Sequence, residues 1–317
     1  MAARDAASAA LSIKKVRSTA KAHSSEKPAP EKLALSRFPN FKLPDFAIVG
    51  VARAGTTSLA TWLAQHPELQ MSPIKETNYF ARPDLGTGGP GDHWLNTPPE
   101  FDSDGTMRGT HFARIATAED YLRCFAPPKP GARMRGEASV SYAFYPAAAH
   151  RIAKTNPGCK IVFVLRDPVM RAVSNYALFR KLGNETLSME DALAAEKGRI
   201  EDGYQFCWAY TGLSRYRTAI GNYRRWFPVE QIHVAKFEDL IEGRDRMAWQ
   251  SLLRFLGAEE EFEPIRHHYN DTKEEQATRP IDDAAVTKLN AELTDEVRFY
   301  RRLFASEDER KAALAEC

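Results

Sequence analysis

One short segment constrains the fold most, because it combines a strand, a tight loop and a helix in immediate succession. The apolar run Asp45–Val51 predicts a buried strand. A helix follows the loop, with Leu59, Trp62 and Leu63 spaced along one face, and Pro67 ends it. A strand that enters a helix through so short a connection favours a fold in which strands and helices alternate.

The loop in this segment has the properties of an anion site. Gly50 and Gly55 allow tight turns and the close approach of a ligand. The helix that begins near Thr56 directs its first N–H groups and the positive end of its dipole at the loop. A glycine turn that only joins strand to helix is the alternative. The residues that would hold a phosphate are Arg53, Ala54, Gly55, Thr56, Thr57 and Ser58.

The loop differs from that of ATP-dependent kinases. Its spacing, Gly50-x4-Gly55, matches the first half of the Walker A pattern, but Thr56 occupies the place of the lysine. That lysine contacts the β- and γ-phosphates of a bound triphosphate, so its replacement argues against ATP chemistry.

Three further segments predict strands of the same sheet. Lys160–Leu165 is a second buried strand, Ile232–Phe237 a third, and Arg135–Val140 a fourth. Pro168 starts a helix through about Leu182. Strands separated by helices predict an α/β fold with a mostly parallel central sheet and helices on both faces.

The chain divides into a tail, one domain and a short end. Residues 1–43 hold nine Lys/Arg and three Asp/Glu and predict a basic, disordered tail or linker. The domain is expected over 44–305, with an irregular insertion at 82–132 that contains a short helix near 117–125. Residues 283–304 have a helical pattern, and 306–317 are expected to form a C-terminal tail.

Composition excludes several classes of protein. The net charge of +2 gives no general reason to expect a nucleic-acid partner. No apolar run approaches the ~20 residues that span a bilayer, and no secretory signal is evident. Four scattered cysteines without metal-ligand spacing favour a reducing compartment, the cytoplasm, and no metal site. A single Cys124–Cys207 bridge is the alternative to four free thiols.

Four segments in order resemble one enzyme family. The loop 49–58 resembles the 5′-phosphosulfate loop of sulfotransferases that use 3′-phosphoadenosine-5′-phosphosulfate (PAPS). The others are 66–80, with Lys75-Glu76-Thr77-Asn78-Tyr79-Phe80, then 136–142, then Val164-Leu165-Arg166-Asp167-Pro168 with Arg171 and Ser174. The resemblance is greatest to the carbohydrate-type branch, which includes heparan sulfate enzymes and bacterial relatives.

The resemblance implies PAPS as co-substrate and assigns residues to it. The loop would hold the 5′-phosphosulfate, and Arg166 and Ser174 the 3′-phosphate. The planar donor fork of arginine suits a phosphate, and ligands of open α/β sheets collect where strands end. A late loop that covers the nucleotide in the family would supply Lys273, Thr278 and Arg279.

The resemblance also assigns the chemistry. Glu76 would be the base that takes the acceptor proton, while Lys75 and Asn78 would contact the acceptor. Arg53 stands where many relatives have lysine, and we expect it to act electrostatically because arginine stays protonated. Asn78 and Ala138 differ from the histidine and lysine of heparan sulfate enzymes, which puts heparan-like specificity in doubt.

Two other functions remain open at this stage. A small-molecule kinase with a modified phosphate loop would need ATP and magnesium, and a non-catalytic nucleotide-binding protein would not need Glu76. For a sulfotransferase, the acceptor would carry a hydroxyl or an amine, on a saccharide, a glycolipid or a small metabolite. The sequence does not predict the oligomeric state.

Overall fold

Strand β1 (Phe46–Gly50) lies at the centre of a five-stranded sheet, in the order β2-β5-β1-β6-β7, whose strand pairs are all parallel. The computed structural model describes residues 43–86, 89, 97–266 and 283–317. The other strands of this sheet are β2 (Leu69–Met71), β5 (Met134–Ala138), β6 (Lys160–Leu165) and β7 (Ile232–Lys236).

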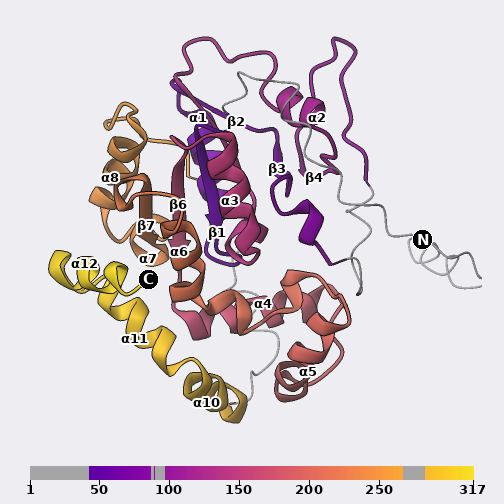
Figure 1. Ribbon diagram of the computed structural model, residues 1–317, viewed down its shortest axis with the longest axis vertical. Coiled ribbons are helices and arrows are strands. Elements are labelled where there is room, and N and C mark those ends of the chain that lie inside the picture. Colours follow the sequence, from indigo (N-terminus) through magenta and orange to yellow (C-terminus); the bar gives the residue numbers. More distant parts are fainter. Residues whose placement is uncertain (1–42, 87–88, 90–96, 267–282) are drawn as a thin grey trace, which may run out of the picture. The chain divides into compact units, whose positions relative to one another are not determined.

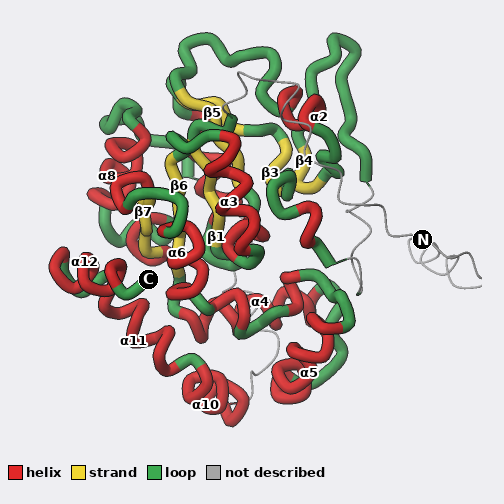
Figure 2. Tube along the Cα trace, in the orientation of Figure 1, coloured by secondary structure: helices red, strands yellow, loops and turns green. Residues whose placement is uncertain are grey.

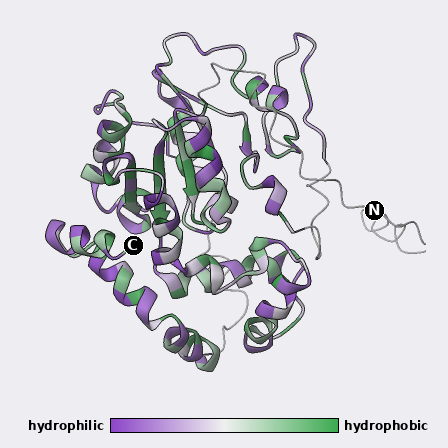
Figure 3. Ribbon diagram, viewed as in Figure 1, coloured by the Kyte–Doolittle hydropathy of each residue, from purple (hydrophilic) through white to green (hydrophobic). Residues whose placement is uncertain are grey.

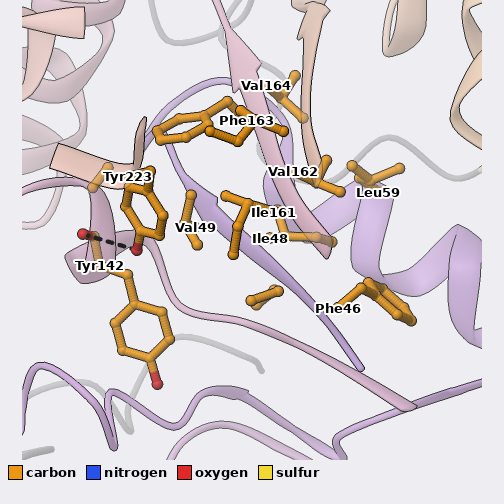
Figure 4. Packing of buried hydrophobic residues seen from close by; sticks show 14 of the residues in the cluster. Phe46, Ile48, Val49, Leu59, Tyr142, Ile161, Val162, Phe163, Val164 and Tyr223 are labelled. Atoms are coloured by element: carbon orange, nitrogen blue, oxygen red, sulfur yellow. Dashed lines mark hydrogen bonds between the residues drawn. The ribbon is translucent and has the colours of Figure 1, made fainter. Parts of the chain in front are cut away.

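Both faces of the sheet are covered, which explains why its two central strands, β1 and β6, are almost entirely apolar. All five residues of β1 are buried, as are all but the first of β6. Successive residues of β6 point to opposite faces, so Phe163 packs edge-on against Tyr223 while Val162 lies on the side of Leu59 (Figure 4). In Figure 3 these central strands are predominantly hydrophobic.

Different helices cover the two faces (Figure 1). On one face α1 (Thr56–Gln65) and α8 (Arg246–Leu256) meet through Trp62 and Trp249, whose ring centroids are 6.4 Å apart. On the other face α3 (Pro146–Thr155) packs against α6 (Tyr216–Arg224). The α/β fold expected from the sequence, with a parallel sheet and helices on both faces, is confirmed.

Two sequence signals fix the ends of the helices that border the site. Gly55, in the left-handed region at φ 76°, precedes α1, and the chain is extended again at His66, before Pro67. The carboxylate of Asp167 accepts hydrogen bonds from the N–H groups of Val169 and Met170 and so caps α4 (Pro168–Lys181).

The predicted insertion at 82–132 contains regular structure where it is described. β4 (Thr110–Phe112) pairs in parallel with β3 (Ile74–Glu76) to form a second, two-stranded sheet. A capping box at Thr117 and Asp120 starts α2 (Ala118–Arg123), close to the helix expected there.

The C-terminal part of the chain is helical (Figure 2). The stretch expected to be helical forms α10 (Asp283–Glu292) and α11 (Thr294–Leu303). Residues 306–317, expected as a tail, form α12 (Glu307–Ala315), which packs against α11 and buries Ala313 and Leu314. The remaining helices are α5 (Met189–Glu201) and α7 (Phe237–Leu240).

All four cysteines lie in described residues and are free thiols. Within the ranges that the structure describes, no helix is both long enough and apolar enough to cross a membrane.

Candidate active site

The loop after β1 is held in its tight path by close packing at its two glycines. A Cβ atom at Gly50 would lie 2.7 Å from the Cβ of Ala143, and one at Gly55 would lie 2.8 Å from two side-chain carbons of Ile241. Arg53 itself has a φ of 68°, which non-glycine residues rarely adopt. Loop and helix therefore present backbone N–H groups and the positive end of the α1 dipole at the carboxyl end of β1.

The loop and the end of β6 meet directly, although more than a hundred residues separate them in the chain. Nε of Arg53 donates to Oγ of Ser174 at 3.0 Å. Nη1 of Arg166 donates to the carbonyl oxygen of Arg53 at 3.4 Å. The sequence prediction that Arg53, Arg166 and Ser174 share one site is therefore matched by their placement, because parallel strands bring their carboxyl ends to one edge.

Arg166 is oriented by two neighbours. Its guanidinium carbon lies 4.8 Å from the centroid of the Phe237 ring, a cation–π contact. The hydroxyl of Tyr216, at the start of α6, donates to the carbonyl oxygen of Arg166 at 2.8 Å. This bond anchors the backbone at Arg166.

Glu76 at the end of β3 is a buried carboxylate held by a backbone N–H group and a lysine. Its Oε2 accepts a hydrogen bond from the N–H of Val140 at 2.9 Å, and its Oε1 forms an ion pair with Lys75. The side chains of both partners in this pair are at least nine-tenths buried. Val140 belongs to an apolar cluster with Phe206, Ala209 and Leu213, and Ala52 of the loop packs against the same cluster.

Asn78 uses its side chain to fix the segment that follows Glu76. Its φ is 51°, in the left-handed region that asparagine tolerates better than most residues. Nδ2 donates to the carbonyl oxygen of Glu76 at 3.1 Å, and Oδ1 accepts from Oγ of Ser141 at 2.5 Å. With only 3% of its surface exposed, Asn78 holds the backbone of Glu76, and its predicted contact with an acceptor stays a prediction.

The sequence predicted no role for Glu137, which lies on strand β5. The residue is fully buried, and its carboxylate accepts hydrogen bonds from four hydroxyl groups. Burial raises the pKa of Glu137, and the hydroxyl donors partly oppose that shift. An acidic residue inside a buried strand was the signal, because such a residue needs several partners. The donors are Thr77, Tyr121, Ser139 and Tyr142.

The predicted contacts of the late loop, Lys273, Thr278 and Arg279, lie outside the described residues. Within the described part of the insertion, β4 places His111 beside Lys75, between the paired residues Ile74–Thr110 and Glu76–Phe112.

Comparison with known proteins identifies the family of this chain. The model of the sulfotransferase family matches residues 44–264, more than half of the chain. Among curated proteins, the chain is 28% identical over 134 residues, 42% of its length, to the membrane-associated sulfotransferase kil1 of Dictyostelium discoideum. It is 23% identical over 203 residues, 63% of its length, to heparan sulfate glucosamine 3-O-sulfotransferase 5 of Mus musculus. The matched parts are 22% and 49% of those two relatives, so the chain spans about half of their length or less.

Among solved structures, the sulfotransferase from Alicyclobacillus acidocaldarius superimposes with a TM-score of 0.69 at 30% sequence identity. That match covers 83% of this chain and 96% of the bacterial protein. The strand–loop–helix of β1 and α1, the arginine at the end of β6 and the family match over 44–264 lead to one conclusion: this chain belongs to the sulfotransferase family, whose members use PAPS.

Proposed function

We propose that the protein transfers the sulfuryl group of PAPS to a hydroxyl or amine of an acceptor. The observation that carries the proposal is the direct contact of the loop with the end of β6, through Arg53, Ser174 and Arg166. A nucleotide with phosphates at both its 5′ and 3′ positions needs cationic groups at two points. Two arginines from different elements supply them at one sheet edge.

The loop is suited to take up charge from the leaving group. As the S–O bond to the 5′-phosphate breaks, negative charge grows on the phosphate oxygen. The N–H groups at the start of α1, the hydroxyls of Thr56 to Ser58 and the guanidinium of Arg53 would stabilise it. Arg53 stays protonated throughout and contributes charge, not a proton.

Glu76 is suited to act as the base. It would accept the proton of the acceptor as the acceptor oxygen or nitrogen forms its bond to sulfur, and adenosine 3′,5′-bisphosphate would leave. The Val140 N–H holds one carboxylate oxygen and Lys75 contacts the other, so the carboxylate is fixed in one orientation. Arg166 and Ser174 would fix the 3′-phosphate and so align sulfur with the acceptor.

We also propose the chemical class of the acceptor. We infer a saccharide, a glycolipid or a small metabolite, because the similar proteins include a heparan sulfate glucosamine sulfotransferase. Asn78 and Ala138 differ from the heparan sulfate pattern, so we do not extend the proposal to that polymer.

Incubation of the purified protein with labelled PAPS and a panel of acceptors tests the proposal. The panel includes a free saccharide, a glycolipid, a small alcohol and an amine, and mass spectrometry detects the added sulfuryl group. We expect label in one acceptor class together with release of adenosine 3′,5′-bisphosphate. Transfer from ATP and magnesium in place of PAPS would support a kinase, and tight binding of PAPS without transfer to any acceptor would favour a non-catalytic role.

A further inference from the structure

Helix α4 carries an arginine that is completely buried beside the proposed nucleotide site. Arg171 has 0% of its surface exposed. Its Nε donates to Oγ of Ser214 at 2.7 Å, and its Nη2 donates to the carbonyl oxygen of Tyr210. The third nitrogen, Nη1, has no hydrogen-bond partner among the residues that the structure describes. A buried donor without a partner is costly, so its retention calls for a physical explanation.

Arg171 lies on the same side of α4 as Ser174, because the two residues are three positions apart in a helix. Ser174 accepts the hydrogen bond of Arg53, and Arg53 in turn accepts one from Arg166 through its carbonyl oxygen. Arg53 therefore contacts both Ser174 and Arg166, and Arg171 is three positions from Ser174 on α4.

The positive charges of the cluster that consists of Arg53, Arg166 and Arg171 repel one another. Burial, together with the positive charges of Arg53 and Arg166, lowers the pKa of Arg171 to about 10, despite the opposing effects of Tyr216 and Glu196. The carboxylate of Glu196 is itself held by the N–H groups of Thr211 and Gly212 and by the hydroxyl of Thr211. Neither Arg166 nor Arg171 forms an ion pair with a carboxylate within the described ranges. The cluster therefore has an excess of positive charge that a polyanion would neutralise.

We propose that Arg171 is a positioning residue whose buried charge selects nucleotides with a 3′-phosphate. Its positive charge makes the electrostatic potential more positive at the place where Arg166 and Ser174 would hold that phosphate. Its hydrogen bonds also anchor residues 210–214. This inference rests on the proposed function, because it needs that nucleotide to bind there. It assigns to Arg171 a share of the discrimination between adenosine 3′,5′-bisphosphate and adenosine 5′-monophosphate.

The full-length protein, its Arg171→Met and Arg171→Lys variants and a matched control allow a test. The control is Arg199→Met. Arg199 on α5 forms an ion pair with Glu185, and Glu185 accepts a hydrogen bond from the hydroxyl of Tyr210. Arg199 therefore also helps to anchor residues 210–214. Calorimetry gives the dissociation constants of the two nucleotides for each protein, and their ratio measures the 3′-phosphate preference. A thermal melt shows that each variant is folded.

We expect Arg171→Met to reduce the preference for the 3′-phosphate about tenfold or more, since a buried charge acts through a low dielectric. Arg171→Lys, which keeps the charge, should restore part of it, and Arg199→Met should lower the melting temperature with the ratio unchanged. An unchanged ratio in folded Arg171→Met, or an equal loss in Arg199→Met, would overturn the inference. A wild-type protein with no preference for the 3′-phosphate would instead refute the proposed function.

Discussion

The two sides of the candidate active site are built from opposite charges. The arginine side consists of Arg53, Arg166, Arg171 and Ser174. Its cations come from a loop, a strand end and a helix, and Arg53 contacts both Ser174 and Arg166. On the carboxylate side, which consists of Glu76, Glu137 and their hydrogen-bond partners, two buried acids lie at the ends of β3 and β5.

Each side satisfies its charges in a different way. Glu76 pairs with Lys75 of its own strand, and Glu137 is surrounded by hydroxyl groups. The arginines bind a hydroxyl, backbone carbonyls and an aromatic face. The carboxylate side is thus complete within the protein, whereas the arginine side keeps an excess of positive charge. The difference teaches that one side is prepared to receive an anionic ligand and the other to hold a proton acceptor in place.

The strongest test of this contrast is Glu76→Gln. We expect turnover with PAPS and a working acceptor to fall by about a thousandfold, because loss of a general base typically costs that order of magnitude. Binding of adenosine 3′,5′-bisphosphate should stay within about threefold of wild type, since the arginine side is intact. Single-turnover kinetics and calorimetry measure the two quantities.

Glu201→Gln, on the exposed face of α5, is the control for this substitution and should leave both quantities unchanged. Full activity of Glu76→Gln would remove Glu76 from the chemistry. Lost nucleotide binding would show that the two sides are not independent.

The second test acts on the other side. Arg166→Met should weaken binding of adenosine 3′,5′-bisphosphate about a hundredfold, because it removes charge-assisted hydrogen bonds to phosphate. At saturating PAPS, turnover should change much less than in Glu76→Gln. Calorimetric titration checks the first expectation, and initial rates at saturating PAPS check the second.

Arg254→Met is the matched control for Arg166→Met, because Arg254 is an exposed arginine paired with Glu260. Nucleotide affinity that is equally reduced in both variants would indicate a general effect of charge. Undiminished affinity in Arg166→Met would place the 3′-phosphate elsewhere.

The arginine side could be predicted from the sequence because local rules position it. An apolar run, two glycines and a helix start define the loop, and Pro168 after Arg166 marks the end of β6. Parallel strands then bring both places to one edge of the sheet. The side chain of Arg171 could not be assigned in this way, since its burial depends on residues 210–214, which reach it only in the folded chain.

The carboxylate side was harder to predict from local sequence patterns. The resemblance named Glu76, but the hydrogen bond that its carboxylate accepts from Val140 is a tertiary contact across 64 residues. The partners of Glu137 come from four separate positions between Thr77 and Tyr142, and no periodicity relates them. Strand β4 was not predicted, because three residues without a strong apolar pattern give too weak a signal.

A third prediction concerns the proton balance of the carboxylate side. Burial raises the pKa of Glu137 above the ordinary 4.5, so the folded state binds its proton more tightly than the unfolded state. This contribution to stability is present below pH 4.5 and is lost as the pH rises through the folded-state pKa. As the pH rises from about 4.5, the melting temperature of Glu137→Gln should therefore fall less than that of wild type. The difference between the two decreases should be roughly 2–4 °C.

Thermal melts from acidic to neutral pH check this expectation, with Glu201→Gln as the control for loss of one acidic group. A parallel pH dependence of wild type and Glu137→Gln would mean that Glu137 has the same proton affinity in both states. An altered affinity for adenosine 3′,5′-bisphosphate is not expected, because Glu137 belongs to the carboxylate side.

The smallest effect is expected beyond the carboxylate side, in the described part of the insertion. Arg108 forms ion pairs with Glu100 and Asp102 at 3.0 and 2.9 Å, and all three side chains are more than half exposed. Exposed ion pairs contribute little, because water and salt screen them, so Arg108→Ala should lower the melting temperature by less than about 3 °C. The Michaelis constant for an acceptor should not change if these two ion pairs are the only role of Arg108. A markedly raised constant, with nucleotide affinity intact, would extend the carboxylate side to the insertion and make Arg108 a determinant of acceptor specificity.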